Sequence, residues 1–246
     1  MLLTETAAQT ITFLLTLIYS QVHHESAEQI SVLEPTLKLK EFVEQYGQPF
    51  SEMLGIDLET RRNEEIVKWF LASVLYGKPI RESSATSTYR VFEEKGVLSA
   101  SRILQCGWEG IVSILDEGTY TRYDFSTARR LLEIFGNLEK NYGGDLNRLH
   151  ASAKDSKDLE LRLKALGTGI GDTTVSIFLR DMRGIWDKAN PKPSPMVILA
   201  MKELGIKDLE KTAKAYRLNV VRLETSLLRL GKDFLKKNKK LEIEMR

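Results

Sequence analysis

Three glycines alternate with other residues in one short stretch of the chain, which reads Leu-Gly-Thr-Gly-Ile-Gly over residues 166–171. Because glycine has no Cβ, Gly169 and Gly171 allow the backbone to turn sharply, while Ile170 between them can anchor the turn in the interior. Amides at the start of the following segment would then face outward, where the helix dipole helps them to bind a phosphate group. We therefore expect a phosphate-binding turn between two helices; the alternative is an ordinary helical hairpin whose glycines only permit close packing.

A turn of this kind can bind the backbone of duplex DNA, but it carries no base information because the phosphates are the same at every step. The formal net charge is only +2, so affinity for nucleic acid would have to come from local placement of lysine and arginine. One such cluster near the C-terminus sets five lysines against a single acid, Asp233; it is either a solvated helix end or a phosphate contact. Its lysines are Lys232, Lys236, Lys237, Lys239 and Lys240.

Metal and membrane chemistry find little support in the sequence. Cys106 is the only cysteine, which excludes an internal disulfide and a cysteine cluster for zinc or an iron–sulfur centre. The histidines at 23, 24 and 150 show no metal-ligand spacing. The apolar run at 11–19 is shorter than the roughly 20 residues that cross a bilayer, and no basic residue precedes it as in a signal peptide. We expect no membrane partner and an intracellular protein, cytoplasmic or associated with the nucleoid.

The elements that must position the glycine-rich turn are helices. With 42% apolar and 28% charged residues, the 246-residue chain has the composition of a globular protein with one large domain or two small lobes. Apolar residues recur at helical spacing, and no convincing strand pair appears. The predicted helices are 5–21, 37–47, 66–75, 84–95, 99–105, 108–116, 125–142, 156–165, 173–182, 195–204, 208–215 and 219–237.

Capping residues mark the ends of the longest central helix. Asp124 is expected as its N-cap, and Gly143-Gly144 as the residues that end it. The sequence predicts an all-α fold with two lobes. Residues 1–60 and 183–246 would form a terminal helical lobe, and 61–182 a central helical lobe that ends in the glycine-rich hairpin.

From about 66 to 205, the order of these segments resembles the helix-hairpin-helix (HhH-GPD) DNA glycosylase superfamily, with endonuclease III among its members. Its hairpin reads Leu-Pro-Gly-hydrophobic-Gly, and residues 166–171 fill that role with one residue more. Residues 125–132 are similar to the helix that leads into the hairpin, and 70–78 to a buried helix whose end supplies a side chain for the minor groove. The resemblance implies a two-lobed helical glycosylase fold with duplex DNA as its partner.

The resemblance also implies which residues contact DNA. Lys78 would be the wedge that fills the gap left by a flipped base; the alternative is a solvated lysine in a Gly-Lys-Pro turn. A monovalent cation at the hairpin is the one cofactor that the resemblance allows. The predicted DNA-binding residues are Gly169, Ile170, Gly171, Thr173, Thr174 and Lys78.

The chain departs from the family where catalysis is concerned. Thr173 stands where lyases of the family carry the lysine that forms a Schiff base, so lyase activity is not expected. Ser194 stands where the family's catalytic aspartate is expected. Asp187 is the nearest acid that a differently folded loop could supply, with Asp172 and Asp181 as weaker candidates; the alternative for Asp187 is a solvent-facing loop acid.

Three functions follow from these residues. The first is a monofunctional DNA glycosylase-like hydrolase of base excision repair, which flips and removes an altered base, and in which Trp186 either stacks on that base or only packs in the core. The second is a catalytically silent helix-hairpin-helix protein that binds DNA or recognises damage. The third is a helical protein that binds another protein and has no affinity for DNA.

Overall fold

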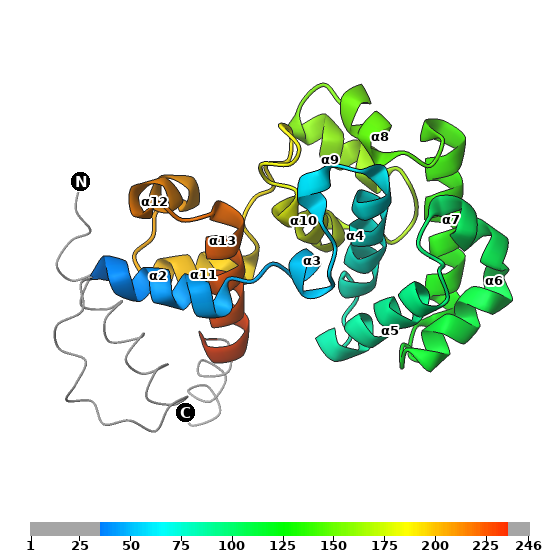
Figure 1. Ribbon diagram of the computed structural model, residues 1–246, viewed down its shortest axis with the longest axis horizontal. Helices are drawn as coiled ribbons and strands as arrows, with labels where there is room; N and C mark the ends of the chain where they lie inside the picture. The colour runs from blue at the N-terminus through cyan, green and yellow to red at the C-terminus, as the bar shows by residue number, and fades with distance from the viewer. Residues whose placement is uncertain (1–34, 236–246) are drawn as a thin grey trace. The chain divides into compact units, whose positions relative to one another are not determined.

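The computed structural model describes residues 35–235, so the helix predicted at 5–21 and the lysines at 236–240 lie outside the described part (Figure 1). The described residues are predominantly helical and contain no strand; one isolated bridge joins Arg183 and Trp186. The predicted all-α class is therefore confirmed. Among residues 35–235, no helix is both long and apolar enough to cross a membrane.

The chain divides into two compact units. The terminal unit comprises 1–49 and 193–246, and the central unit comprises 50–192. The sequence predicts the boundaries between the two units after residues 60 and 182, whereas the structure places them after residues 49 and 192. The segments in question, 50–60 and 183–192, belong to the central unit, where Ser51 binds the buried Asp181.

The terminal unit is a small bundle built on one helix that is buried on nearly every side. Along that helix, the buried residues include Leu223 and Leu227 but also Glu224, Thr225 and Ser226, a pattern typical of a helix surrounded by others. The unit contains α2 (Pro35–Tyr46), α11 (Pro195–Glu203), α12 (Leu209–Tyr216), the buried helix α13 (Val220–Arg229) and the π-helix η3 (Leu230–Leu235).

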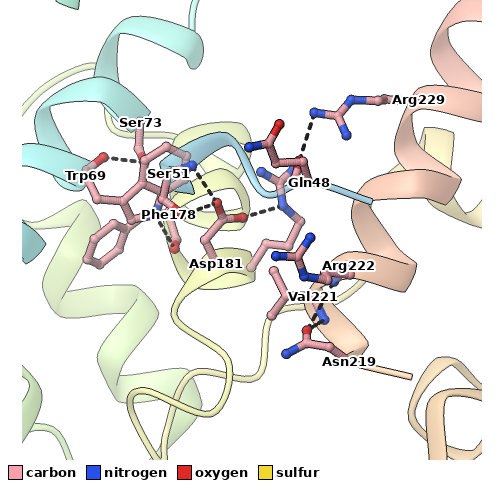
Figure 2. Close-up of polar contacts among 11 residues, drawn as sticks. Gln48, Ser51, Trp69, Ser73, Phe178, Asp181, Asn219, Val221, Arg222 and Arg229 are labelled. Atoms are coloured by element: carbon pink, nitrogen blue, oxygen red, sulfur yellow. Dashed lines mark hydrogen bonds and ion pairs between the residues drawn. The ribbon is translucent and has the colours of Figure 1, made fainter. Parts of the chain in front are cut away.

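Arg229 closes the C-terminal end of α2. The last carbonyls of a helix have no partner within it, and the Arg229 guanidinium donates to Tyr46 O and, at 2.9 Å, to Gln48 O (Figure 2). Gly231 lets η3 approach α11, because a Cβ there would lie 2.1 Å from Met196 O. The Arg229 hydrogen bonds join the two parts of the chain that form the terminal unit, and the approach at Gly231 packs η3 on α11 within the second part.

The central unit packs its helices around α4 (Asn63–Tyr76), which lies in the middle of the unit (Figure 1). Ile66, Trp69 and Phe70 of α4 are fully buried. Trp69 Nε1 donates to Phe178 O at 3.0 Å, which ties α4 to α10 (Figure 2). The other elements are α3 (Phe50–Met53), η2 (Leu58–Thr60), α5 (Glu82–Glu94), α6 (Ala100–Glu117), α7 (Asp124–Tyr142), α8 (Leu146–Ser152), α9 (Ser156–Lys164) and α10 (Asp172–Asp181).

Several helix ends agree with the predicted ones. Gly107, with φ 68° and ψ 177°, breaks α6 between the two helices that were predicted separately. Gly143, with φ 64°, ends α7 as expected. The prediction for Asp124 was one residue off: Tyr123 is the N-cap, and Asp124 is the first residue of α7, where its carboxylate accepts from the Phe125 amide at 2.6 Å.

The prediction missed α8 as well as the short elements α3 and η2 of the central unit. The helix α8 contains only seven residues, of which Leu146 and Leu149 are buried. Asp145 is its N-cap and accepts from the amides of Asn147 and Arg148. A single buried pair in so short a segment leaves no repeated apolar spacing for the sequence to display.

Candidate functional site

The glycine-rich segment forms a turn between α9 and α10. Ile170 is 6% exposed and Leu166 is 1% exposed, so both anchor the turn in the interior, as predicted for Ile170. Gly169 has a φ of +95°, which residues with a Cβ rarely adopt. Gly171 has a φ of −101° and a ψ of −174°, an extended conformation open to any residue. The conformational need for glycine therefore applies to Gly169 but not to Gly171.

The first turn of α10 leaves backbone amides available to a ligand. The first backbone hydrogen bond of this helix runs from Val175 N to Gly171 O at 3.1 Å. Gly171 has no side chain that could cap the amides of residues 172–174. Gly171, Asp172 and Thr173 are exposed to solvent. The site therefore presents uncapped amide hydrogens at the positive end of a helix dipole.

Thr174, another predicted DNA contact, has a structural side chain. It is 1% exposed, and its Oγ1 would lie 2.1 Å from a Cβ placed on Gly77. The Thr174 side chain therefore fills the space that Gly77 leaves at the end of α4. Any contribution of Thr174 to ligand binding would have to come from its amide.

Two cationic side chains meet at Gly169. Lys78 Nζ donates to Gly169 O at 3.1 Å. A Cβ placed on Gly169 would lie 2.8 Å from Arg130 Cδ and 2.9 Å from Lys78 Nζ. Partial burial and the nearby charge of Arg130 lower the pKa of Lys78 from its ordinary value. An anion bound here would relieve the repulsion between the two cations.

The acids around the turn are engaged by other partners. Asp172 forms an ion pair with Lys164 at 2.5 Å, and this contact lowers the pKa of Asp172. Glu133 accepts from the Thr168 hydroxyl and, at 3.1 Å, from the Thr168 amide, and these bonds lower the pKa of Glu133. Within residues 35–235, neither Lys78 nor Arg130 has a carboxylate within ion-pair distance.

The turn does not fit the monovalent cation that the resemblance allows. Such an ion is held by backbone oxygens, and three carbonyls of this turn already accept hydrogen bonds. Leu166 O accepts from Asn137 Nδ2 at 2.8 Å, Gly167 O from the Ile170 amide at 3.4 Å, and Gly169 O from Lys78. The Lys78 ammonium would also repel a second cation. Among the described residues, no group of three or more His, Cys, Asp or Glu could hold a metal ion.

Asp187, the predicted catalytic acid, lies in the loop after α10 and pairs with a histidine. Its Oδ1 is 2.8 Å from His150 Nε2, and its side chain is 78% exposed. The two side chains form an ion pair only when His150 is protonated. Lys188 donates to His150 O at 3.1 Å. Within the described residues no hydrogen bond or ion pair joins Asp187 to the glycine-rich turn.

The other residues considered for catalysis have structural contacts. Trp186 is 4% exposed, and its ring stacks on His150 with centroids 4.6 Å apart. Ser194 is the N-cap of α11 and accepts from the Val197 amide. Asp181 is 5% exposed and accepts from the amide and hydroxyl of Ser51 (Figure 2).

Sequence reasoning did not assign a role to Arg130. Arg130 lies within the segment 125–132 that resembles the helix before the hairpin. Its proximity to Gly169 depends on how α7 packs against the turn. A pair of arginines in the middle of an amphipathic helix was the one signal available. Comparisons with models of protein families, with curated proteins and with solved structures found no match to this chain.

Proposed function

We propose that this protein binds the sugar–phosphate backbone of DNA through the turn at 168–174 together with Lys78 and Arg130. The observation that carries the proposal is that Lys78 and Arg130, which within residues 35–235 have no carboxylate at ion-pair distance, converge on Gly169 next to the uncapped N-terminus of α10. Each of these features attracts a phosphate, and together they offer both charge and directed amide donors.

DNA is favoured over a small anion by the form of the site. Residues 171–173, which carry the amides, are exposed, and Lys78 and Arg130 beside them are half-buried, so the site is open to a phosphate that belongs to a long polymer. The resemblance of the segment to a helix-hairpin-helix points to the same ligand. Such contacts bind without sequence preference, because they reach only the backbone.

The proposal is binding without base removal. Removal of a base needs an acid or an activated water next to the sugar. The turn has Thr173 in place of a Schiff-base lysine, Asp172 is paired with Lys164, and Asp187 is paired with His150 in a different loop. The arrangement therefore supports the catalytically silent form of the DNA-binding hypothesis better than the glycosylase.

The binding proposal is tested by fluorescence anisotropy of a labelled duplex over a range of salt concentrations. Lys78→Ala and Arg130→Ala should each weaken binding to duplexes of unrelated sequence by similar factors. Each should also reduce the slope of log affinity against log salt by about 1, as expected when one phosphate contact is lost. Lys140→Ala is the matched control, because Lys140 is an exposed cation about 15 Å further along α7. Equal salt slopes for all three variants and the unmodified chain would contradict the proposal.

The absence of base removal has its own test. The protein is incubated with duplexes that carry uracil, alkylated purines, oxidised guanine or abasic sites, and released base and cut strands are measured. We expect neither product from any of these duplexes. Base release that disappears in Asp187→Asn would instead establish the glycosylase.

A further inference from the structure

Two aromatic rings of the central unit stack on each other while remaining open to solvent. Trp108 of α6 is 41% exposed and Phe125 of α7 is 56% exposed. Their ring centroids are 5.5 Å apart and their planes differ by 27°. Large apolar side chains that gather at the surface often mark a binding site, and neither ring is among the buried residues of the core.

The backbone around the pair favours this exposure. Gly107 breaks α6 immediately before Trp108, with a φ of +68°. A Cβ on Gly107 would meet no atom within 4 Å, so the space beside the break is open. Phe125 is the second residue of α7, where its ring can extend from the end of the helix.

Exposed cations lie next to the rings on α7. Phe125 and Arg129 are four residues apart and therefore share a face of the helix. Arg129 is exposed, and within residues 35–235 it has no carboxylate at ion-pair distance. Arg122 is also exposed and lies over the Tyr123 ring at 5.3 Å. Arg129 therefore places a guanidinium group beside Phe125 that can attract a phosphate, and Arg122 adds a second cation three residues before Phe125 in the chain.

Three acids lie near the rings on these elements: Glu109, which is exposed and follows Trp108, and the pair Asp116 and Asp124. Asp124 accepts from the Phe125 amide at 2.6 Å. Burial and the neighbouring Asp124 raise the pKa of Asp116. Asp116 and Asp124 therefore repel an approaching phosphate less than two free aspartates would.

The same helix connects the rings with the phosphate site. Arg130, which contacts Gly169, follows Phe125 by five residues, or about 7.5 Å along the axis of α7. Arg129 lies between them in sequence. Around the helix axis the two residues are about 140° apart, so a strand bound at Gly169 reaches the aromatic pair by passing over Arg129 and around α7.

From this placement we infer that Trp108 and Phe125 form a stacking platform for an unpaired nucleobase of the DNA strand held at the turn. The inference rests on the proposed function, because the phosphate contacts bring the strand to the platform. A paired base has both faces covered by its neighbours in the duplex, whereas an unpaired base has a face free to stack on an aromatic ring. The preferred ligand is therefore DNA with unpaired bases, either single-stranded or next to a duplex.

The test compares two oligonucleotides of equal length, oligodeoxythymidylate and an abasic strand that retains the sugars and phosphates but has no bases. Both can contact Lys78 and Arg130, but only the first can stack. We expect the unmodified protein to bind oligodeoxythymidylate about 10-fold more tightly than the abasic strand. Trp108→Ala should remove this difference without lowering the affinity for the abasic strand. Phe125→Leu, which keeps an apolar side chain but no ring, should reduce the difference.

Tryptophan fluorescence gives an independent readout. Trp69 and Trp186 are 0% and 4% exposed, so quenching on addition of oligodeoxythymidylate reports mainly on Trp108. Quenching should be absent with the abasic strand. Leu161→Ala is the control variant, because Leu161 is 57% exposed and lies on α9. That variant should behave like the unmodified protein in both measurements.

The outcomes separate this inference from the proposed function. If both strands bind with equal affinity and Lys78→Ala weakens both, the phosphate site stands and the platform is wrong. If thymidylate quenches Trp108 but Lys78→Ala and Arg130→Ala change nothing, the platform stands and the phosphate site is wrong. If neither strand binds, both are wrong, and the exposed rings then fit a protein partner.

Discussion

Two loops flank α10 and differ in whether their polar groups have hydrogen-bond partners within the protein. The turn before the helix leaves amides open and gathers Lys78 and Arg130 around Gly169. In the loop after it, at 182–192, the polar groups form hydrogen bonds within the loop and with α8. In that loop Arg183 donates to Asn190 and Pro191, Trp186 Nε1 donates to Asn147 at 3.0 Å, and Lys188 donates to His150 O at 3.1 Å.

This difference distinguishes a binding loop from a structural loop. A loop whose donors and acceptors are satisfied internally gains stability but has little to offer a ligand. A turn that leaves the first amides of a helix uncapped and brings two cations together gives up that stability and gains affinity for an anion. Changes in the loop after α10 should therefore affect folding, whereas changes in the turn should affect DNA binding.

The largest effect is expected from Trp186→Ala. Trp186 is buried, stacks on His150 and packs edge-on against Phe178, so its removal leaves a large cavity. We expect the free energy of unfolding to fall by about 3–5 kcal/mol, as for other buried tryptophans. Urea denaturation followed by circular dichroism measures the change.

Two further variants sharpen that result. Trp186→Phe retains a ring for stacking but loses the hydrogen bond to Asn147, and should cost about 1–3 kcal/mol, less than the alanine variant. Asp187→Asn changes a side chain that is 78% exposed and should alter stability by less than about 1 kcal/mol. If Asp187→Asn were as destabilising as Trp186→Ala, the loop would depend on the carboxylate rather than on the buried ring.

A smaller effect on stability, joined to an effect on binding, is expected from Gly169→Ala. Its φ of +95° strains any residue with a Cβ, and we expect a loss of about 1–2 kcal/mol in the free energy of unfolding. The new methyl group would also displace Arg130 and Lys78 from the turn. DNA affinity, measured by anisotropy at low salt, should therefore fall by about 10-fold.

Gly171→Ala is the matched control for that variant. It lies two residues away in the same turn, has an extended backbone, and has no atom within 4 Å of the position of a new Cβ. Stability should be unchanged or rise by up to about 1 kcal/mol, because alanine restricts the unfolded chain more than glycine does. Equal losses of DNA affinity in the two alanine variants would show that the cations at Gly169 are not what distinguishes the turn.

Local sequence patterns predicted the elements of this protein better than its contacts. The break at Gly107 and the end of α7 at Gly143 follow from the backbone preferences of glycine, which act within a few residues. Ile170 is predicted as an anchor for the same reason, whereas Lys78 is predicted from the resemblance. By contrast, the position of Arg130 beside Gly169 depends on how distant segments pack.

The loop after α10 illustrates the same limit. Asp187 was considered as a catalytic acid because it is the acid nearest to the expected position in the sequence. Its partner His150 comes from α8, a helix that the apolar periodicity did not reveal. Thr174 was expected to contact DNA, but its side chain is buried against Gly77, and this burial depends on the packing of α10 on α4.

The smallest expected effect is a pH dependence of stability that arises in the loop after α10. Burial, followed by the charge of Lys188, lowers the pKa of His150, although Asp187 opposes the shift. A histidine with a lowered pKa in the folded state is protonated more readily in the unfolded chain. Its neutral form therefore stabilises the fold above the unfolded pKa of about 6.5, and this stability is lost as the pH falls through the folded pKa.

Urea midpoints measured between pH 7.5 and 5 should decline less in His150→Gln than in the unmodified protein, and more in Asp187→Asn, where the opposing carboxylate is gone. An identical decline in all three proteins would assign the pH dependence to other groups, and the loop would then differ from the turn by its packing alone.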